Sequence, residues 1–540
     1  MQKLLLLGCE AIAQAGIDAG LSGIYAYPGT PSTEIAEFIQ HSKEAKEKNI
    51  RCNWSANEKT AMEAALGMSY AGKRAMVSMK HVGLNVAADS FVNSAITGAN
   101  GGLIVVSADD PSMHSSQNEQ DSRFYGKFSL IPTFEPSNQQ EAYDMVRYGF
   151  EFSEKYKIPV LLRITTRMAH SRTGVVRKPT LSQNNIKLPT NMRQFVLLPA
   201  IARKQYKALL KSQELFEKES ETANFNKYIE GKDKSLGIIA CGIAYNYVLE
   251  NYADRNVPYP ILKISQYPLP RKMVEKIFGE CKEMLVLEEG APMIEESLKG
   301  FLPKGIKIKG RLDGTIPRDG ELNPNIVGVA LGFPDTKGAA IPAIVANRPP
   351  SLCNGCPHTD SFLGLNEALA EYAKGNVFSD IGCYTLSALP PLESVNSCVD
   401  MGASITMAKG AADAGLFPAV AVIGDSTFTH SGMTGLLDAV NDKSNITVII
   451  LDNATTAMTG GQTSSAFGKI ENICKALGVE EEHIRIIKPL HKNHAENTAI
   501  MKEELLYKGV SVIIPRRECI QTLNKRMRDK FKNKEKENSK

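Results

Sequence analysis

Short apolar runs alternate with longer stretches of helical pattern along nearly the whole chain, which is typical of parallel α/β layers. A stretch rich in Ala, Met and Glu, Asn57–Ala71, predicts a helix. In the first third, the apolar runs predict strands at Lys3–Leu7, Arg74–Met79, Leu103–Ser107 and Val160–Ile164. The first third therefore reads as one α/β layer system.

Two connector-like passages divide the chain. RKPTLSQNNIKLPTN (177–191) and PDTKGAAIPAIVANRPP (334–350) have the Pro, Gly and Asn content of linkers. Between them, an α/β pattern begins near Ser235, and EMLVLEEG (283–290) reads as a buried strand. After them, strands are expected at Ala419–Ile423, Thr447–Leu451 and Val510–Ile514. The fold class is therefore α/β, with three doubly wound domains at 1–176, 235–335 and 351–522, a connection at 177–234 and a basic tail at 523–540.

Composition supports a globular protein. The 540 residues are 43% hydrophobic and 23% charged. No run approaches the roughly 18 apolar residues of a membrane span. The opening MQKLLLLGCEAIAQAG has only four consecutive leucines, and we interpret it as a first strand rather than a secretory signal. We expect a cytoplasmic protein.

Net charge is small and uneven. The whole chain carries +4; residues 525–540 hold eight Lys/Arg and three Asp/Glu, which leaves about −1 for the rest. Such a tail is usually a solvated helix end or a disordered segment, and binding to a nucleic acid or an acidic partner is the alternative. The remainder predicts neither nucleic-acid nor membrane binding.

The ten cysteines are sparse for this length, which favours a reducing compartment. Only Cys353 and Cys356 form a C-x-x-C pair. No second pair follows at zinc spacing, and no C-x-x-C-x-x-C run exists to hold an iron–sulfur cluster.

The most informative segment is AVAVIGDSTFTHSGMTGLLDAVNDKSNITVIILDNATTAMTGGQ (419–462). One predicted strand ends in Gly424-Asp425, and the next ends just before Asn453, 28 residues after Asp425. Adjacent parallel strands place their carboxyl ends side by side. The Asp425 carboxylate, the Asn453 amide oxygen and the Thr455 carbonyl could then bind Mg²⁺ together with a diphosphate. Gly424 would let the backbone approach the phosphates.

This arrangement resembles the thiamine-diphosphate motif, GDG followed by NN. It departs from the motif at Ser426 and Asp452, neither of which removes an expected metal ligand. Asp and Asn at strand ends are also common as caps and turns, so the pattern alone does not decide between a metal site and a turn.

A second segment, NEKTAMEAALGMSYAGKRAMV, has Glu58 at the start of an Ala-rich helix. It is similar to the N-E-x-x-A-x-x-A-A-x-G-x-A segment of thiamine enzymes. In that class a carboxyl group hydrogen-bonds the aminopyrimidine ring and supports loss of the thiazolium C2 proton. The structural alternative for Glu58 is a capping or helix-dipole role.

At greater length the chain resembles the large subunit of indolepyruvate:ferredoxin oxidoreductase. The resemblance covers about residues 1–520 and rests on YAYPGTPSTEI, WSANEKTAMEAA, HVGLNVAADS, DDPSMHSSQNEQDSR, GRLDGTIPRDGELNP, CNGCPH, SDIGCYTLSALPPL, GDSTFTHSG and LDNATTAMTGGQ. It implies a pyrimidine-binding, a transketolase-C-like and a diphosphate-binding domain, in that order. It also implies oxidative decarboxylation of an aryl 2-oxo acid to its acyl-CoA, with ferredoxin reduced.

The resemblance also implies roles for individual residues. Thr30 would lie near the substrate carboxylate, unless its Pro-Gly-Thr-Pro turn only caps the helix that follows. The remaining candidates are His81 as a proton donor or substrate contact, His114 and Arg123 as substrate ligands, and Cys356, His358, Gly382, Cys383, Gly424, Ser426 and Met458 at the cofactor. Ordinary buried thiols and a helix-start histidine are the alternatives for the cysteines and His358.

Large subunits of this family commonly continue into a ferredoxin-like domain, whereas here VIIPRREC is followed by the basic tail. We therefore expect no iron–sulfur cluster in this chain and electron transfer through a separate cluster-bearing component. A small β/γ-type subunit, external CoA and a dimer or heterotetramer are implied as well. The alternatives are a non-oxidative thiamine-dependent decarboxylase or carboligase, and a non-catalytic scaffold subunit.

Overall fold

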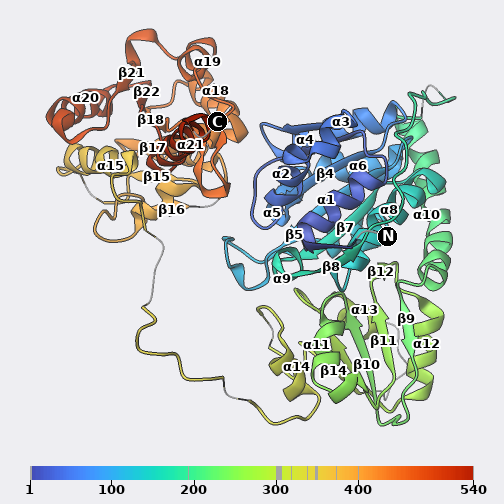
Figure 1. Cartoon of the computed structure of the whole chain (residues 1–540). Helices are drawn as coiled ribbons and strands as arrows, with labels where there is room; N and C mark the ends of the chain where they lie inside the picture. The colour runs from blue at the N-terminus through green and yellow to red at the C-terminus, as the bar shows by residue number, and fades with distance from the viewer. Residues whose placement is uncertain are drawn as a thin grey trace. The chain divides into compact units, whose positions relative to one another are not determined.

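The computed structural model describes residues 3–191, 194–299, 307–317, 319–336, 338–346, 351–372, 374–398 and 400–538. The chain folds into two compact units, Met1–Ala340 and Ile341–Lys540 (Figure 1). Both are built from parallel sheets with helices, so the α/β class expected from the alternating pattern is confirmed.

The N-terminal sheet of the first unit runs in the order β12-β6-β7-β5-β4-β2-β3. Its strands are β12 (Gln266–Tyr267), β6 (Thr133–Phe134), β7 (Val160–Thr165), β5 (Leu103–Asp109), β4 (Ala75–Lys80), β2 (Gly23–Ala26) and β3 (Arg51–Trp54). All neighbours are parallel except β12 and β6. The expected first strand, β1 (Lys3–Leu7), forms outside this sheet and pairs antiparallel with β8 (Arg172–Val176).

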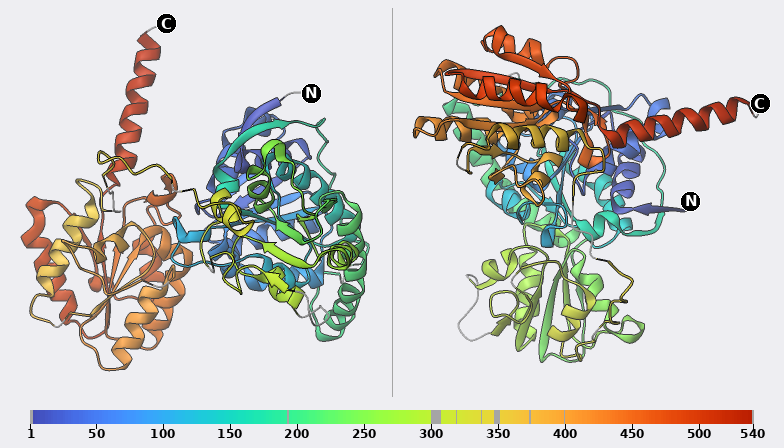
Figure 2. Two further views of the ribbon diagram at one scale, coloured as in Figure 1. Left: turned by 90° about the horizontal axis from the view of Figure 1, so that it is seen from below. Right: turned by 90° about the vertical axis from the view of Figure 1, so that its left-hand side faces the viewer.

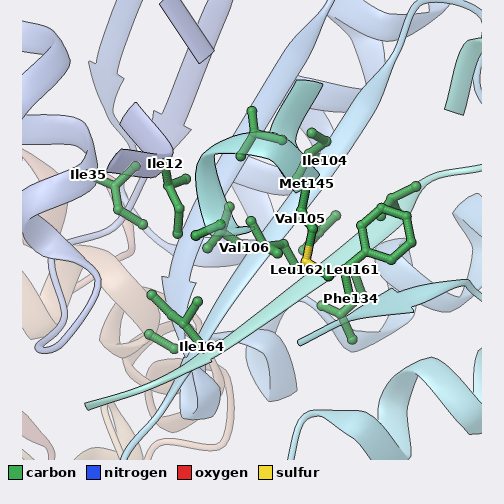
Figure 3. Close-up of a cluster of buried hydrophobic side chains, with 14 of the residues drawn as sticks. Ile12, Ile35, Ile104, Val105, Val106, Phe134, Met145, Leu161, Leu162 and Ile164 are labelled. Atoms are coloured by element: carbon green, nitrogen blue, oxygen red, sulfur yellow. The ribbon is translucent and has the colours of Figure 1, made fainter. Parts of the chain in front are cut away.

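Helices cover this sheet: α1 (Gly8–Asp18), α2 (Thr33–His41), α3 (Lys43–Glu47), α4 (Glu58–Tyr70), α5 (His81–Val86), α6 (Ala88–Thr97), α7 (Arg123–Ser129), α8 (Gln139–Tyr156), α9 (Thr166–His170) and α10 (Pro199–Thr222). Figure 3 shows Ile12 of α1 and Met145 of α8 among the aliphatic side chains of β5 and β7. Strands that are buried on both faces read as continuous apolar runs, which is why β5 and β7 were predictable.

The second sheet of this unit has the order β14-β13-β10-β11-β9, with only β9 antiparallel. Its elements are β9 (Lys227–Ile229), β10 (Leu236–Cys241), β11 (Ile261–Ile264), β13 (Glu283–Leu287), β14 (Lys307–Lys309), α11 (Ala244–Glu250), α12 (Arg271–Glu280), α13 (Met293–Lys299) and α14 (Pro324–Ala330). The chain leaves this sheet to add β12 to the N-terminal one. The first two expected domains therefore share one compact unit while each keeps its own sheet.

The second unit contains a parallel sheet of order β16-β15-β17-β18-β22-β21. Its strands are β15 (Val377–Ser379), β16 (Ser397–Cys398), β17 (Ala419–Gly424), β18 (Ile446–Leu451), β21 (Ile484–Ile487) and β22 (Val510–Pro515), beside a small hairpin of β19 (Thr455–Thr456) and β20 (Gln462–Thr463). The helices are α15 (Pro357–Ala368), α16 (Ala403–Asp413), α17 (Asp425–Thr427), α18 (Met433–Asn441), α19 (Ile470–Ala476), α20 (His494–Leu506) and α21 (Ile520–Asn538).

The basic tail forms most of α21, which projects as a single rod from the second unit (Figure 2). The side chains described on it from residue 524 to 529 are exposed. The sequence analysis expected either a solvated helix end or a disordered segment here, and the structure has a helix. No helix in the described ranges is both long and apolar enough to cross a membrane.

Candidate functional site

The expected metal ligands of the second unit lie at the carboxyl edge of its sheet. β17 and β18 are adjacent and parallel, with Gly424 opposite Leu451. The residues that follow, Asp425 and Asp452, therefore leave the sheet side by side. The arrangement that the spacing predicted for these two strand ends is the one that the structure has.

Asp425 is a buried carboxylate that lacks a counter-charge. It is 3% exposed, and its Oδ1 accepts a hydrogen bond of 2.6 Å from the Ser426 amide. Ser464 and the Ala454 amide lie near the carboxylate, but its Oδ2 makes no hydrogen bond of acceptable geometry among the described residues. Burial, and then the charge of Asp452, raises the pKa of Asp425 to about 7. Asp452 is itself paired with the Arg516 guanidinium at 2.6 Å. A cation beside Asp425 would satisfy both its charge and its free oxygen, so the residues fit a bound Mg²⁺.

Asn453 and Thr455 are buried next to this carboxylate's strand end. The Asn453 Oδ1 accepts a hydrogen bond of 3.1 Å from the Thr455 amide, and its second lone pair can still bind a cation. The Asn453 Nδ2 lies 3.2 Å from Nε2 of His358. Burial lowers the pKa of His358 to about 4, so this histidine is neutral and positions the Asn453 side chain.

A buried tyrosine explains two of the expected glycines. A Cβ on Gly424 would lie 2.7 Å from the ring of Tyr384, and one on Gly382 would lie 2.2 Å from it. The Tyr384 hydroxyl donates to Asp380, whose Oδ2 also accepts from Ser404 Oγ at 2.7 Å. The sequence analysis explained Gly424 by a close approach to a phosphate. In the structure, the group that lies close to Gly424 is the Tyr384 ring.

Asp380 was missed from the sequence. It is fully buried, and burial raises its pKa to about 7. It directly follows β15, which pairs in parallel with β17. The strand-end rule that selected Asp425 also selects Asp380, so the signal was present but the short β15 was not recognised as a strand.

Other expected cofactor contacts in this unit are more varied. Ser426 Oγ lies 2.9 Å from Thr456 Oγ1, which joins the Asp425 loop to the β19–β20 hairpin. Met458, in the turn of that hairpin, is exposed.

Cys383 lies in the second unit, where other thiols act on it. Burial, and then charge on Cys356, Cys519 and Cys353, raises the pKa of Cys383 to about 12. Spacing along the chain had suggested only the Cys353–Cys356 pair. Among the described residues, no group of three or more His, Cys, Asp or Glu side chains is arranged to hold a metal. The expectation of a cluster-free chain stays a prediction.

The candidate ring contact, Glu58, belongs to the first unit. It is the first residue of α4, behind an Asn57 N-cap whose Oδ1 accepts from Thr60 at 2.8 Å. The Glu58 side chain is buried against the backbone of α5: a Cβ on Gly83 would lie 2.5 Å from its Oε1. The side-chain cap of α4 is therefore Asn57 and not Glu58.

His81 begins α5, two residues from that contact. It is 1% exposed, and burial lowers its pKa, although the charge of Asp109 opposes this. Asn118 lies near the ring, but neither ring nitrogen makes a hydrogen bond within the described part of the chain. A buried imidazole with two unused nitrogens is unusual, because buried polar atoms are normally paired. It favours a ligand-facing role for His81.

Of the expected substrate ligands, Thr30 and His114 lie in loops. The Thr30 carbonyl is 3.4 Å from Ser115 Oγ, so its loop contacts the loop that carries His114. His114 is half exposed, with Nε2 3.6 Å from Glu321.

Arg123 does not suit the expected substrate role. It is fully buried, where its guanidinium binds Asp121, Glu288 at 2.9 Å, and the carbonyls of Glu289 and Ala291. These partners use its donors and balance its charge. It joins the N-terminal sheet region to the loop after β13. The sequence could not show this, because Glu288, Glu289 and Ala291 are more than 160 residues away.

Comparison with known proteins places these sites in a class. The family model "Pyruvate flavodoxin/ferredoxin oxidoreductase, thiamine diP-bdg" matches residues 14–221, and "Thiamine pyrophosphate enzyme, C-terminal TPP binding domain" matches residues 380–513. The first range contains Glu58 and the second contains Asp425. The chain therefore contains two thiamine-diphosphate-binding domains.

The relatives narrow the class. A protein described as "Indolepyruvate oxidoreductase subunit IorA" from Archaeoglobus fulgidus is 39% identical over 96% of this chain and 86% of its own length. The protein of that name from Pyrococcus abyssi gives the same identity and coverage. This chain belongs to the indolepyruvate oxidoreductase subunit IorA family.

More distant similarity agrees with the fold. A "2-oxoglutarate synthase subunit KorA" from Methanocaldococcus jannaschii is 27% identical over 35% of this chain and 53% of its own length. The solved 2-oxoglutarate:ferredoxin oxidoreductase from Magnetococcus marinus superposes with a TM-score of 0.50 and 16% identity, covering 61% of this chain and 65% of that one. At that identity it supports the fold alone.

Proposed function

We propose that this protein is the α subunit of an indolepyruvate-type 2-oxo acid:ferredoxin oxidoreductase. It would convert an aryl 2-oxo acid and CoA to the acyl-CoA and CO₂, while two electrons and a proton leave and two ferredoxins are each reduced by one electron. The observation that carries this function is the family membership over 96% of the chain, together with the unpaired buried carboxylate oxygen of Asp425 inside a thiamine-diphosphate domain.

In this proposal, Asp425, Asn453 and the Thr455 carbonyl hold Mg²⁺, and the diphosphate supplies further oxygen ligands. His358 and the Thr455 amide hold the Asn453 side chain in place. Tyr384 backs the Gly424 turn and keeps the Asp425 loop in place. The thiamine diphosphate, when bound, supplies an electron sink for the pair released as CO₂ leaves.

Glu58 would share a proton with the aminopyrimidine ring. Its burial against Gly83 limits access of water to that carboxyl group, which would favour exchange of a proton with the ring over exchange with solvent. His81 is neutral and buried, and can accept or donate a proton at the substrate. Thr30 would lie near the substrate carboxylate.

The oxidative half of the reaction requires partners. We propose a small β/γ-type subunit, a ferredoxin or other cluster-bearing protein as electron acceptor, and a dimer or heterotetramer as the assembly. Support comes from the subunit designation of the relatives.

A product assay tests this function. The chain, assembled with its partner subunit, thiamine diphosphate and Mg²⁺, is given indolepyruvate or phenylpyruvate, CoA and a viologen acceptor. We expect acyl-CoA and reduced viologen in a ratio of one to two. Aldehyde as the sole product would instead identify a non-oxidative decarboxylase. Absence of thiamine diphosphate binding in a calorimetric titration would identify a non-catalytic scaffold.

A further inference from the structure

A buried lysine lies between the loops that carry the expected substrate residues. Lys80 is the last residue of β4 and is 8% exposed. Its Nζ donates a hydrogen bond of 2.6 Å to the Ser115 carbonyl. A Cβ on Gly29 would lie 3.1 Å from the Lys80 Cβ, so the lysine stem packs against the turn that precedes Thr30. Lys80 therefore reaches from the sheet edge to the Ser115 loop, beside the Thr30 turn.

The charge of Lys80 is only partly compensated by the protein. Burial lowers the pKa of Lys80 to about 8, against the raising effect of Asp110, so the ammonium stays charged at neutral pH. Asp110 lies beyond ion-pair distance and is hydrogen-bonded by the Ser115 amide at 2.8 Å and by Thr166 Oγ1 at 2.7 Å. The ammonium has three donors, and the Ser115 carbonyl accepts from one of them.

The buried cations Arg123 and Arg163 differ from Lys80 because each has carboxylate partners. Arg123 binds Asp121 and Glu288, and Arg163 binds Asp109 at 2.7 Å. Both guanidinium groups are therefore neutralised by carboxylates at contact distance. Lys80 has a backbone carbonyl as its contact partner, which leaves its charge available to an anion.

The position of Lys80 points to the anion. The next residue is His81, whose two ring nitrogens have no partner in the described structure, and Gly83 touches Glu58. Lys80 is the N-cap of α5, so the lysine and the glycine that touches the carboxyl group assigned to the cofactor ring belong to one short segment. A 2-oxo acid carries its carboxylate one bond from the reacting carbonyl carbon, and burial of that carboxylate requires a paired cation.

We propose that the Lys80 ammonium binds the carboxylate of the 2-oxo acid substrate and so selects for acids over neutral carbonyl compounds. This inference rests on the proposed function for the identity of the substrate. It replaces Arg123, which the sequence suggested for the same task.

Equilibrium binding of two unreactive ligands tests the proposal. 3-Phenylpropionate has the carbon chain of phenylpyruvate without the oxo group, and 3-phenylpropanamide is its neutral counterpart. Both are titrated into the assembled enzyme by calorimetry. A charged hydrogen bond to a buried group corresponds to about a 10- to 100-fold change in Kd. We expect wild type to prefer the acid by that factor, and Lys80→Met and Lys80→Gln to lose the preference.

The variants are matched. Lys80→Gln keeps a donor for the Ser115 carbonyl, so it remains informative if Lys80→Met does not fold. Lys80→Arg keeps the charge and should keep part of the preference. Lys43→Gln removes a charge from the exposed start of α3 and should change nothing. In turnover, the KM for phenylpyruvate should rise in Lys80→Gln, while affinity for thiamine diphosphate stays at the wild-type value.

The outcomes separate this inference from the proposed function. A wild-type enzyme that decarboxylates phenylpyruvate while Lys80→Gln keeps its full preference for the acid overturns the role of Lys80 alone. Loss of the preference in an enzyme that does not decarboxylate 2-oxo acids supports the carboxylate site and overturns the proposed function. Equal binding of acid and amide by wild type overturns the site.

Discussion

Asp425→Asn should have opposite effects on the cofactor-free and the cofactor-bound protein. The substitution keeps the shape of the side chain and removes its charge. Without a cation, the carboxylate is buried beside Asp452 and has one oxygen unpaired. With Mg²⁺ bound, the same carboxylate is a ligand. Asparagine should therefore stabilise the cofactor-free protein and weaken binding of Mg²⁺ with the cofactor.

The size of the first effect follows from the pKa. A rise from the ordinary 3.8 to about 7 for Asp425 corresponds to about 4 kcal/mol, at about 1.4 kcal/mol per unit. The folded protein holds this proton more tightly than the unfolded chain does, so the contribution of Asp425 to the stability of the cofactor-free protein falls as pH rises from about 4 to 7 and stays lower above 7. At pH 8, Asp425→Asn should be more stable than wild type by up to about 4 kcal/mol, and the difference should shrink toward pH 4.

Urea denaturation without cofactor at pH 8 and pH 5, and calorimetric titration with Mg²⁺ and thiamine diphosphate, measure the two effects. Loss of the anionic ligand should weaken cofactor binding by at least about 10- to 100-fold. Asp438→Asn, on an exposed position of α18, is the matched control. A variant that binds the cofactor with wild-type affinity, or that is destabilised at pH 8 without it, would refute the assignment of Asp425.

Further predictions concern the other residues. Glu58→Gln should bind thiamine diphosphate normally but exchange its C2 proton slowly; an unchanged exchange rate by NMR would rule out the role of Glu58. Arg123→Met should lower the free energy of unfolding by about 3–5 kcal/mol in a denaturant titration, because it leaves buried carboxylates unpaired; a raised substrate KM at unchanged stability would restore Arg123 as a substrate ligand. Gly424→Ala should cost about 1–3 kcal/mol in the same titration, since its Cβ meets the Tyr384 ring at 2.7 Å; full stability would mean that the ring moves freely. Iron and sulfide analysis of anaerobically purified protein should find no cluster in this chain, and about four irons per chain would contradict the sequence-based expectation.

The sequence predicted the sheets where burial on both faces makes a strand continuously apolar. β4, β5, β7, β17 and β18 lie within a residue or two of their expected positions. The same reasoning located β1 at Lys3–Leu7 but could not assign it to a sheet, because its partner strand β8 is about 170 residues away. It also missed short β15, and with it Asp380.

The candidate site was predictable where local motifs mark it. Asp425 and Asn453 follow strand ends, and Glu58 starts a helix, so their positions follow from the local pattern. Arg123 and Lys80 show what the local pattern could not predict. Both are cations near the expected site, and only the fold reveals that Arg123 meets Glu288 while Lys80 meets a backbone carbonyl. The fate of a charged side chain depends on partners that spacing along the chain does not identify.

The central claim is that one coenzyme is held by Asp425 at its diphosphate and by Glu58 at its aminopyrimidine ring. A cryo-electron microscopy structure of the assembled enzyme with thiamine diphosphate and Mg²⁺ tests this directly. We predict one continuous ligand density, with the metal on Asp425 and Asn453 and the ring within hydrogen-bond distance of a Glu58 carboxylate from the same or a neighbouring copy. Density that touches Asp425 while Glu58 faces a separate cavity would contradict the account.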